Sequence, residues 1–174
     1  MTLAAMVAEL PRNCSLDAKK SSKGDPHYSR GYKPHWDIAS GGRIPISCIL
    51  TGAGVHDSQV AIPLMETSRT RVKWRCDLMD SAYDAAAIRK KSEKLKHEVI
   101  IHPVNRPNNK ETVKWTRQRK QQYKIRTIVE QLNGRLKDQF GGRIIYLRGA
   151  AKVMAHLMFG IIALTVDQIL RTVG

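Results

Sequence analysis

Residues 123–137 read YKIRTIVEQLNGRLK, and they predict a helix with a polar stripe along one side. The stripe consists of Tyr123, Arg126, Glu130 and Lys137, which follow one another at spacings of three, four and seven residues. Residues at these spacings lie near one another because successive helical turns bring them to the same face. The segment therefore groups one carboxylate with two cations and a phenol.

A second stripe on the same expected helix is apolar. Its members are Ile125, Val129, Leu132, Leu136 and Phe140, spaced by four, three, four and four residues. This repeat is typical of a helix that packs one side against a core. We expect the helix to run from about residue 112 to residue 140 and to stop at Gly141-Gly142, since glycine commonly follows the last turn.

The spacing Tyr-x2-Arg-x3-Glu-x6-Lys resembles the signature of bacterial insertion-sequence transposases of the DDE type. The Glu of that signature is the last of three metal-binding carboxylates, which implies this role for Glu130. The resemblance extends from about Cys14 to the C-terminus and includes GYKPH at 31–35, IPISC at 44–48, HDSQ at 56–59 and LMFG at 157–160. A lone Glu on a basic amphipathic helix is ordinarily a solvated, ion-paired residue. The four matching positions together favour the catalytic interpretation.

The second carboxylate is expected at the end of a strand. Residues 73–80 alternate polar and apolar side chains, which predicts a half-buried strand ending near Asp80. Residues 80–84 read DSAYD and resemble the Asp-x-x-Tyr-Asp pattern of the family, so the resemblance implies that Asp80 is the second metal ligand. Asp84 has a structural interpretation, because it is expected to cap a helix over residues 84–95.

The first carboxylate is where the sequence departs from the family pattern. The family places it in a short strand near the start of the domain, where this chain reads CSLDAK at residues 14–19. Ser15 stands at the position where the family's Asp is expected. Asp17 is the first candidate to replace it, because residues two apart share a face of a strand. Asp37 is the alternative, and a third possibility is that the ligand is lost.

The reaction that the resemblance implies is divalent-metal-dependent cleavage and transfer of DNA strands. In-line attack on a phosphodiester builds charge on the incoming and the leaving oxygen, and two divalent ions roughly 3.5 to 4 Å apart stabilise that charge. Mg²⁺ takes oxygen ligands, and Mn²⁺ suits the same ligands. The expected catalytic and metal-binding residues are therefore Asp80, Glu130 and Asp17.

The composition favours DNA as the partner. The chain has 30 Lys and Arg against 15 Asp and Glu, which gives a net charge of +15. Such a field attracts nucleic acid and produces binding that weakens with salt. We expect Arg126, Lys137, Lys120 and Arg119 to contact phosphates, with Tyr123 available to pack against a base or sugar. A solvated charged face is the alternative for these residues.

The C-terminal run of apolar residues raises the question of a membrane span. His156, Asp167 and Gln168 interrupt it, which favours a buried or dimer-forming helix and no membrane contact. The three cysteines show no paired metal-type spacing and suit reduced thiols in a bacterial cytoplasm, where a transposase meets nucleoid DNA. The expected partners are double-stranded DNA, at insertion-sequence ends and at the target, and further copies of the chain.

The length of 174 residues suits one domain with a sizeable core. We expect an N-terminal stub over residues 1–11 and a transposase catalytic domain over residues 12–174. Within the domain we expect a basic loop at about residues 103–111 and a C-terminal helix at about residues 150–172. Because only a short stub precedes Cys14, the sequence suggests an N-terminally truncated copy.

The order of expected elements fits an α/β fold. The elements are a strand near 12–18, a hairpin over 33–50 turning at Gly41-Gly42, a helix in the sixties opened by a cap at His56-Asp57-Ser58, a strand over 73–80, a helix over 84–95, a strand over 98–102, the signature helix and the C-terminal helix. The resemblance implies a ribonuclease-H-like mixed sheet flanked by helices. That fold brings the ends of its first and fourth strands together near the signature helix.

The leading hypothesis from the sequence is a DNA transposase catalytic domain that cleaves and transfers strands at insertion-sequence ends. The departure at Ser15 leaves open whether this copy is active. Two alternatives remain: a nuclease of the same fold, and a catalytically dead DNA-binding remnant that keeps the basic stripe without one of the metal ligands.

Overall fold

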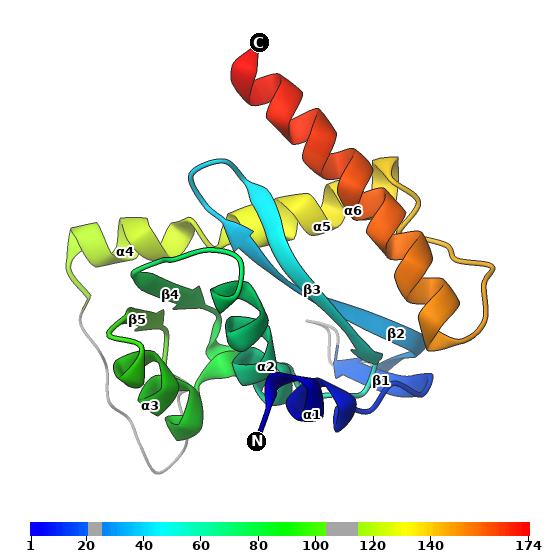
Figure 1. Ribbon diagram of the computed structural model, residues 1–174, viewed down its shortest axis with the longest axis horizontal. Coiled ribbons are helices and arrows are strands. Elements are labelled where there is room, and N and C mark those ends of the chain that lie inside the picture. The colour runs from blue at the N-terminus through cyan, green and yellow to red at the C-terminus, as the bar shows by residue number, and fades with distance from the viewer. Residues whose placement is uncertain (21–25, 104–114) are drawn as a thin grey trace.

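The computed structural model describes residues 1–20, 26–103 and 115–174. Its elements in chain order are α1 (Leu3–Ala8), β1 (Ser15–Lys20), β2 (Pro26–Ala39), β3 (Ile44–Gly52), α2 (Asp57–Arg69), β4 (Cys76–Met79), the 3₁₀ turn η1 (Ser81–Tyr83), α3 (Ala86–Lys94), β5 (Glu98–Ile101), α4 (Arg117–Lys124), α5 (Thr127–Gln139) and α6 (Ala150–Val173). The described strands form an antiparallel sheet in the order β1-β2-β3 and a separate parallel pair, β4-β5 (Figure 1). The α/β class expected from the sequence is confirmed.

The β2–β3 hairpin organises the larger sheet, and its alternating side chains face two different layers. Trp36 packs with α5 and α6 on one face, while the neighbouring His35 lies near Asp57 of α2 on the other. The hairpin turns through Gly41-Gly42 as expected. The residue in the left-handed region is however Arg43, with φ of 53°.

The largest hydrophobic cluster joins α5 and α6 to the hairpin. Its buried members are Trp36, Leu50, Leu132, Leu136, Val153, Leu157, Ile161 and Leu164. Leu132 and Leu136 are each 2% exposed, so the core of the predicted apolar stripe is confirmed. The close approach of α6 depends on Gly160, because a Cβ there would lie 2.4 Å from the carbonyl oxygen of Phe140. After Phe140, Gly141 takes a φ of 74° and ends α5 as expected.

Helix α2 covers the opposite face of the hairpin. Val60 and Leu64 pack with Ile49 of β3 and with Leu10, which follows α1. The sequence did not predict α1, which forms within the expected N-terminal stub. His56 caps α2 as expected, since its Nδ1 accepts a hydrogen bond from the backbone N of Ser58 at 3.3 Å.

The smaller sheet corrects two expectations. The strand expected over 73–80 is confined to β4, whereas the helix expected over 84–95 is present as α3 and follows the separate turn η1. Asp84 does not cap the helix: its Oδ1 accepts a hydrogen bond from Nη2 of Arg89 at 2.7 Å, and Ala85 precedes the first turn of α3. The side-chain ion pair has replaced the predicted backbone contact.

The described residues do not form the single mixed sheet that the resemblance implies. β1 pairs with residues 26–31 of β2, and β3 pairs with residues 32–39, while β4 is hydrogen-bonded to β5. α2 contacts β2 and β3 on one side and η1 and α3 on the other, so the two sheets are joined through this helix. The ribonuclease-H-like arrangement of the first and fourth strands stays a prediction.

Candidate nucleic-acid interface

The signature segment forms two helices where the sequence predicted one. α4 ends at Lys124 and α5 begins at Thr127, while residues 112–114 lie outside the described residues. At the junction the backbone N of Arg126 donates to the carbonyl of Tyr123 at 3.2 Å, an i to i−3 bond that tightens the turn. Ile125 is 41% exposed, so the prediction that it belongs to the buried apolar stripe is wrong.

Arg126 holds the signature together across this junction. Its guanidinium carbon lies 5.3 Å from the centroid of the Tyr123 ring, and its Nη1 lies 2.6 Å from Oε1 of Glu130. The first distance is that of a cation–π contact and the second that of a charge-assisted hydrogen bond. Three of the four signature residues are therefore in contact, and Lys137 is exposed farther along α5.

Three aromatic rings gather beside Arg126 at the start of α4. The centroids of Trp115 and Tyr123 are 4.9 Å apart, and those of His102 and Trp115 are 5.1 Å apart, both in edge-to-face geometry. Trp115 and Tyr123 are half-buried and His102 is exposed. The sequence singled out Trp115 and Tyr123, but His102 joins them only because β5 ends beside α4.

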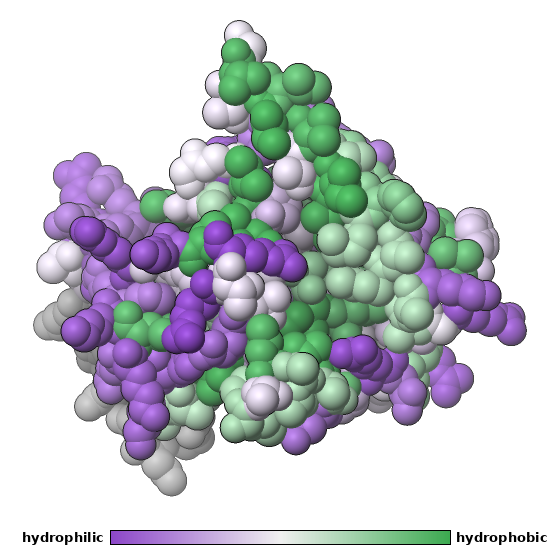
Figure 2. All heavy atoms as spheres, viewed as in Figure 1, coloured by the Kyte–Doolittle hydropathy of each residue, from purple (hydrophilic) through white to green (hydrophobic). Residues whose placement is uncertain are grey.

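The basic residues of α4 divide into two groups. Arg119 is used within the fold, because its guanidinium contacts the carboxylate of Glu98 and the carbonyl of Val99 on β5. Lys120 is exposed. Figure 2 shows hydrophilic residues gathered on the side of the molecule that carries α3, α4 and β5. The expected basic loop at about 103–111 lies, apart from residue 103, outside the described residues.

The three expected carboxylates lie on separate elements. Asp80 caps η1, since its Oδ1 accepts a hydrogen bond from the backbone N of Ala82 at 2.7 Å. Glu130 is in the first turn of α5 with 59% of its side chain exposed, and Asp17 is half-buried on β1 opposite Ser29. Within residues 1–20, 26–103 and 115–174, no three His, Cys, Asp or Glu side chains form a set that could hold a metal ion.

A model of the transposase DDE domain family matches residues 7–166, which is most of the chain. The chain belongs to the transposase DDE domain family. This confirms the resemblance carried by the signature residues and by the Asp80 segment. Members of this family act on DNA and generally use divalent metal ions. No curated protein and no solved structure gave a significant match.

Ser15 has a structural role in this transposase domain. Its Oγ accepts a hydrogen bond from the backbone N of Gly54 at 2.9 Å. A Cβ added to Gly52 would lie 2.6 Å from the same Oγ, so the hydroxyl sits close against the backbone at the end of β3. The position where the family's first Asp is expected therefore holds a group too small to reach beyond this contact.

Asp37, the alternative first ligand, belongs to an acidic cluster that the sequence did not predict. Burial raises the pKa of Asp37, and the nearby Asp77 raises it further, while a hydrogen bond from Ser68 acts in the other direction. Asp77 is 5% exposed and accepts hydrogen bonds from Nε1 of Trp74 at 2.6 Å and from Nδ1 of His97 at 3.1 Å. The Asp77 carboxylate is therefore occupied by Trp74 and His97 within the transposase domain.

Tyr83 connects this cluster to Asp80. Burial raises the pKa of the Tyr83 phenol, and the surrounding carboxylates of Asp57, Asp80 and Asp37 raise it further. Asp37 and Asp80 thus act on the same phenol although Asp37 lies on β2 and Asp80 caps η1. A sequence pattern could indicate Asp80 but not this neighbourhood, because β2 and η1 are distant in the sequence and both contact α2.

The family-like stretch GYKPH has a structural explanation. Lys33 Nζ lies 2.9 Å from Oδ1 of Asp57, and His35 Nδ1 lies 3.5 Å from the same oxygen. The other ring nitrogen of His35 is 2.9 Å from Oγ1 of Thr51. Burial lowers the pKa of His35 to about 4, so the imidazole is neutral at pH 7. These contacts fix the first turn of α2 against the hairpin of the transposase domain.

Proposed function

We propose that this chain is a DNA transposase domain that binds double-stranded DNA, at insertion-sequence ends and at the target, through the surface of α4 and α5. The observation that carries the proposal is the contact of Arg126 with the Tyr123 ring, beside Trp115 and His102. It combines a planar cation with half-buried aromatic rings and the exposed His102 on a strongly basic chain. Proteins that follow a nucleic-acid backbone use this combination.

The proposed contacts are of two kinds, ionic contacts with phosphates and stacking on aromatic rings. Arg126 presents a fork of donors that matches phosphate oxygens, and Lys120 and Lys137 add exposed charge on the same pair of helices. The rings of Trp115 and Tyr123 offer surfaces for a sugar or for a base that has left its stack. Membership of a transposase family supports DNA as the ligand.

We further propose that this copy binds DNA without cutting it. Strand cleavage and transfer would require Asp80, Glu130 and a first carboxylate to converge on Mg²⁺ or Mn²⁺. The described residues do not fit such an ion, because these carboxylates lie on η1, α5 and β1 and form no common set. Ser15 supports the same conclusion, since its hydroxyl is engaged by Gly54. We place the protein with nucleoid DNA in the bacterial cytoplasm, as its family and charge favour.

A working transposase and a nuclease of the same fold are the competing functions, and Asp80 and Glu130 are the residues that favour them. The test measures two properties of the full chain. Fluorescence anisotropy reports binding to a labelled duplex over a salt series, and supercoiled plasmid with Mg²⁺ or Mn²⁺ reports cleavage. The variants are Glu130→Gln, Asp80→Asn and Ser15→Asp, the last restoring the expected family residue.

Salt-dependent binding without cleavage by the wild type is the expected result. Metal-dependent cleavage by the wild type that Glu130→Gln and Asp80→Asn both abolish would overturn the proposal of a dead copy. Joined strands among the products would then identify a transposase, and cut products alone a nuclease. A chain that binds no duplex at low salt would overturn the DNA-binding proposal itself.

A further inference from the structure

The second half of α6 carries an apolar face that the described part of the chain leaves uncovered. Its members are Phe159, Ile162, Val166, Ile169, Leu170 and Val173, which are 43% to 77% exposed. Among the described residues, α6 is also the one helix long and apolar enough to cross a membrane, with 28% of its most apolar window buried. Figure 1 shows α6 extending past the sheet toward the C-terminus, and Figure 2 shows apolar side chains along that extension.

The spacing of this face is that of a helix that pairs with another helix. Phe159, Ile162, Val166, Ile169 and Val173 follow one another by three, four, three and four residues. This is the alternation of two apolar positions in every seven that characterises a coiled-coil seam. The opposite side of α6 is already buried against the hairpin through Leu157 and Leu164, so the exposed seam is a second, separate face.

We propose that this seam pairs with the same seam of a second copy of the chain, making α6 a dimerisation helix. A two-fold interface joins identical surfaces, and a heptad seam is complementary to itself in that arrangement. The exposed parts of the six side chains amount to roughly 600 Å² on each copy, or roughly 1,200 Å² in total, which is the lower end for a specific interface.

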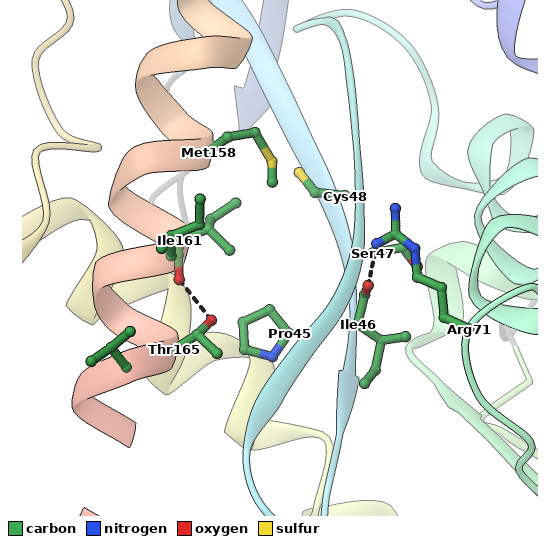
Figure 3. Close-up of a pocket in the computed structure, with 10 residues that line it drawn as sticks. Pro45, Ile46, Ser47, Cys48, Arg71, Met158, Ile161 and Thr165 are labelled. Atoms are coloured by element: carbon green, nitrogen blue, oxygen red, sulfur yellow. Dashed lines mark hydrogen bonds between the residues drawn. The ribbon is translucent and has the colours of Figure 1, made fainter. Parts of the chain in front are cut away.

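A groove beside α6 adds to the surface that a second copy can cover. A cavity of about 260 Å³ lies between α6 and β3, and Figure 3 shows Met158, Ile161 and Thr165 facing Pro45 and Cys48 across it. The Thr165 hydroxyl donates a hydrogen bond to the carbonyl oxygen of Ile161 at 2.7 Å. The α6 side of the cavity is therefore largely apolar. Ile162 and Val166 line the cavity and belong to the seam, so seam and groove form one continuous surface.

The charges near the seam favour a second copy over other partners. The ionised residues between 159 and 173 are Asp167 and Arg171, and their Oδ2 and Nε atoms are 2.7 Å apart. Asp167 also pairs with Arg135 of α5. A chain with a net charge of +15 repels its own copies over most of its surface. Asp167 pairs with both arginines at the seam, so copies can approach there without placing unpaired cations together.

The test is the oligomeric state of the full chain, free of DNA and in high salt, by sedimentation velocity over a micromolar concentration series. We expect a reversible dimer for the wild type and at least a tenfold weaker one for Ile169→Glu, because a charge would be buried in the seam. The matched control is Ile144→Glu, which changes an isoleucine 63% exposed outside α6 and should leave the dimer intact. Circular dichroism checks that each variant keeps its helix content.

Cross-linking tests whether the two seams face each other. In a background with Cys14→Ser, Cys48→Ala and Cys76→Ser, the variant Val166→Cys should form a disulfide dimer in either helix direction, since residue 166 lies at the centre of the seam. A wild type that stays monomeric across the series would overturn the proposal. So would loss of the dimer with Ile144→Glu, or flotation of the wild type with lipid vesicles that Ile169→Glu abolishes while both chains sediment as monomers.

Discussion

Nη1 of Arg126 lies 2.6 Å from Oε1 of Glu130, one helical turn along the signature. The carboxylate expected to bind metal is therefore paired with the cation expected to bind DNA. Because Glu130 is 59% exposed, solvent screens the pair and its contribution to stability is small. A phosphate that takes the guanidinium would release the carboxylate, so DNA binding by Arg126 would free Glu130 from its ion pair.

Arg126→Ala should weaken duplex binding by roughly tenfold at low salt and reduce the slope of log affinity against log salt by about 1, because one phosphate contact is lost. The duplex affinity of Arg126→Lys should fall between those of the wild type and Arg126→Ala, since lysine keeps the charge but loses the planar fork. The measurement is anisotropy over a salt series. Lys152→Ala is the control, because it removes an exposed cation from the first turn of α6, which begins far from α4 (Figure 1). An equal loss for both variants would assign the binding to overall charge.

Replacing the signature tyrosine separates stacking from hydrogen bonding. Tyr123→Phe keeps the ring that contacts Trp115 and Arg126, so single-strand affinity should change by less than about twofold. Tyr123→Ala removes the ring and should cost about 1 to 3 kcal/mol of binding free energy. Titration of a labelled single strand measures both. Equal losses for the two variants would point to the hydroxyl in place of the ring.

Two helical glycines should respond in opposite directions to the same substitution. Gly134→Ala in α5 meets nothing within 4 Å and should raise the free energy of unfolding by about 0.5 to 1 kcal/mol, since alanine favours the helix. Gly160→Ala in α6 would bring its Cβ 2.4 Å from the Phe140 carbonyl oxygen and should lower it by about 1 to 3 kcal/mol. Urea unfolding followed by circular dichroism gives both values. Stabilisation by Gly160→Ala would show that α6 is free to move away from Phe140.

His35 should make the fold sensitive to acid. Its pKa is about 4 in the folded chain against an ordinary 6.5. Between pH 4 and pH 6.5 the imidazole is therefore protonated in the unfolded chain and neutral in the folded chain. The free energy of unfolding should fall by up to about 3 kcal/mol as the pH drops from 6.5 to 4. His35→Gln should flatten this dependence. The raised pKa of Asp37 acts in the opposite sense above pH 3.8, so Asp37→Asn should steepen it. A wild-type stability that does not change over this range would contradict the burial of a neutral His35.

The sequence predicted the elements that depend on local patterns. The apolar repeat containing Leu132 and Leu136, the glycine stop after Phe140 and the cap at His56 all appear in the structure. Each of these follows from periodicity or from the geometry of a single turn, which neighbouring residues determine. The family assignment rested on similar ground, four residues at fixed spacing, and the family model that matches residues 7–166 confirms it.

What the sequence could not predict depends on packing between distant segments. The junction at Ile125, a residue that is 41% exposed, interrupts a helix that periodicity alone would continue. The contact of Ser15 with Gly54 joins residues 39 positions apart, and the carboxylates around Tyr83 come from β2, α2 and the start of η1. The roles of Asp80, Glu130 and Asp17 as ligands stay predictions, since convergence of side chains is a property of the whole fold.

The separation of the two sheets gives the molecule two units of different stability. A two-stranded sheet is marginal by itself, so β4 and β5 depend on their packing against α2 and α3, whereas the β2–β3 hairpin is held from both faces. Backbone amides of the smaller unit should then exchange with solvent through a local opening that leaves the larger unit folded. Asp80 directly follows β4 and Glu130 is anchored through α5 to the large core. The distance between the two carboxylates is thus set by the least stable part of the fold.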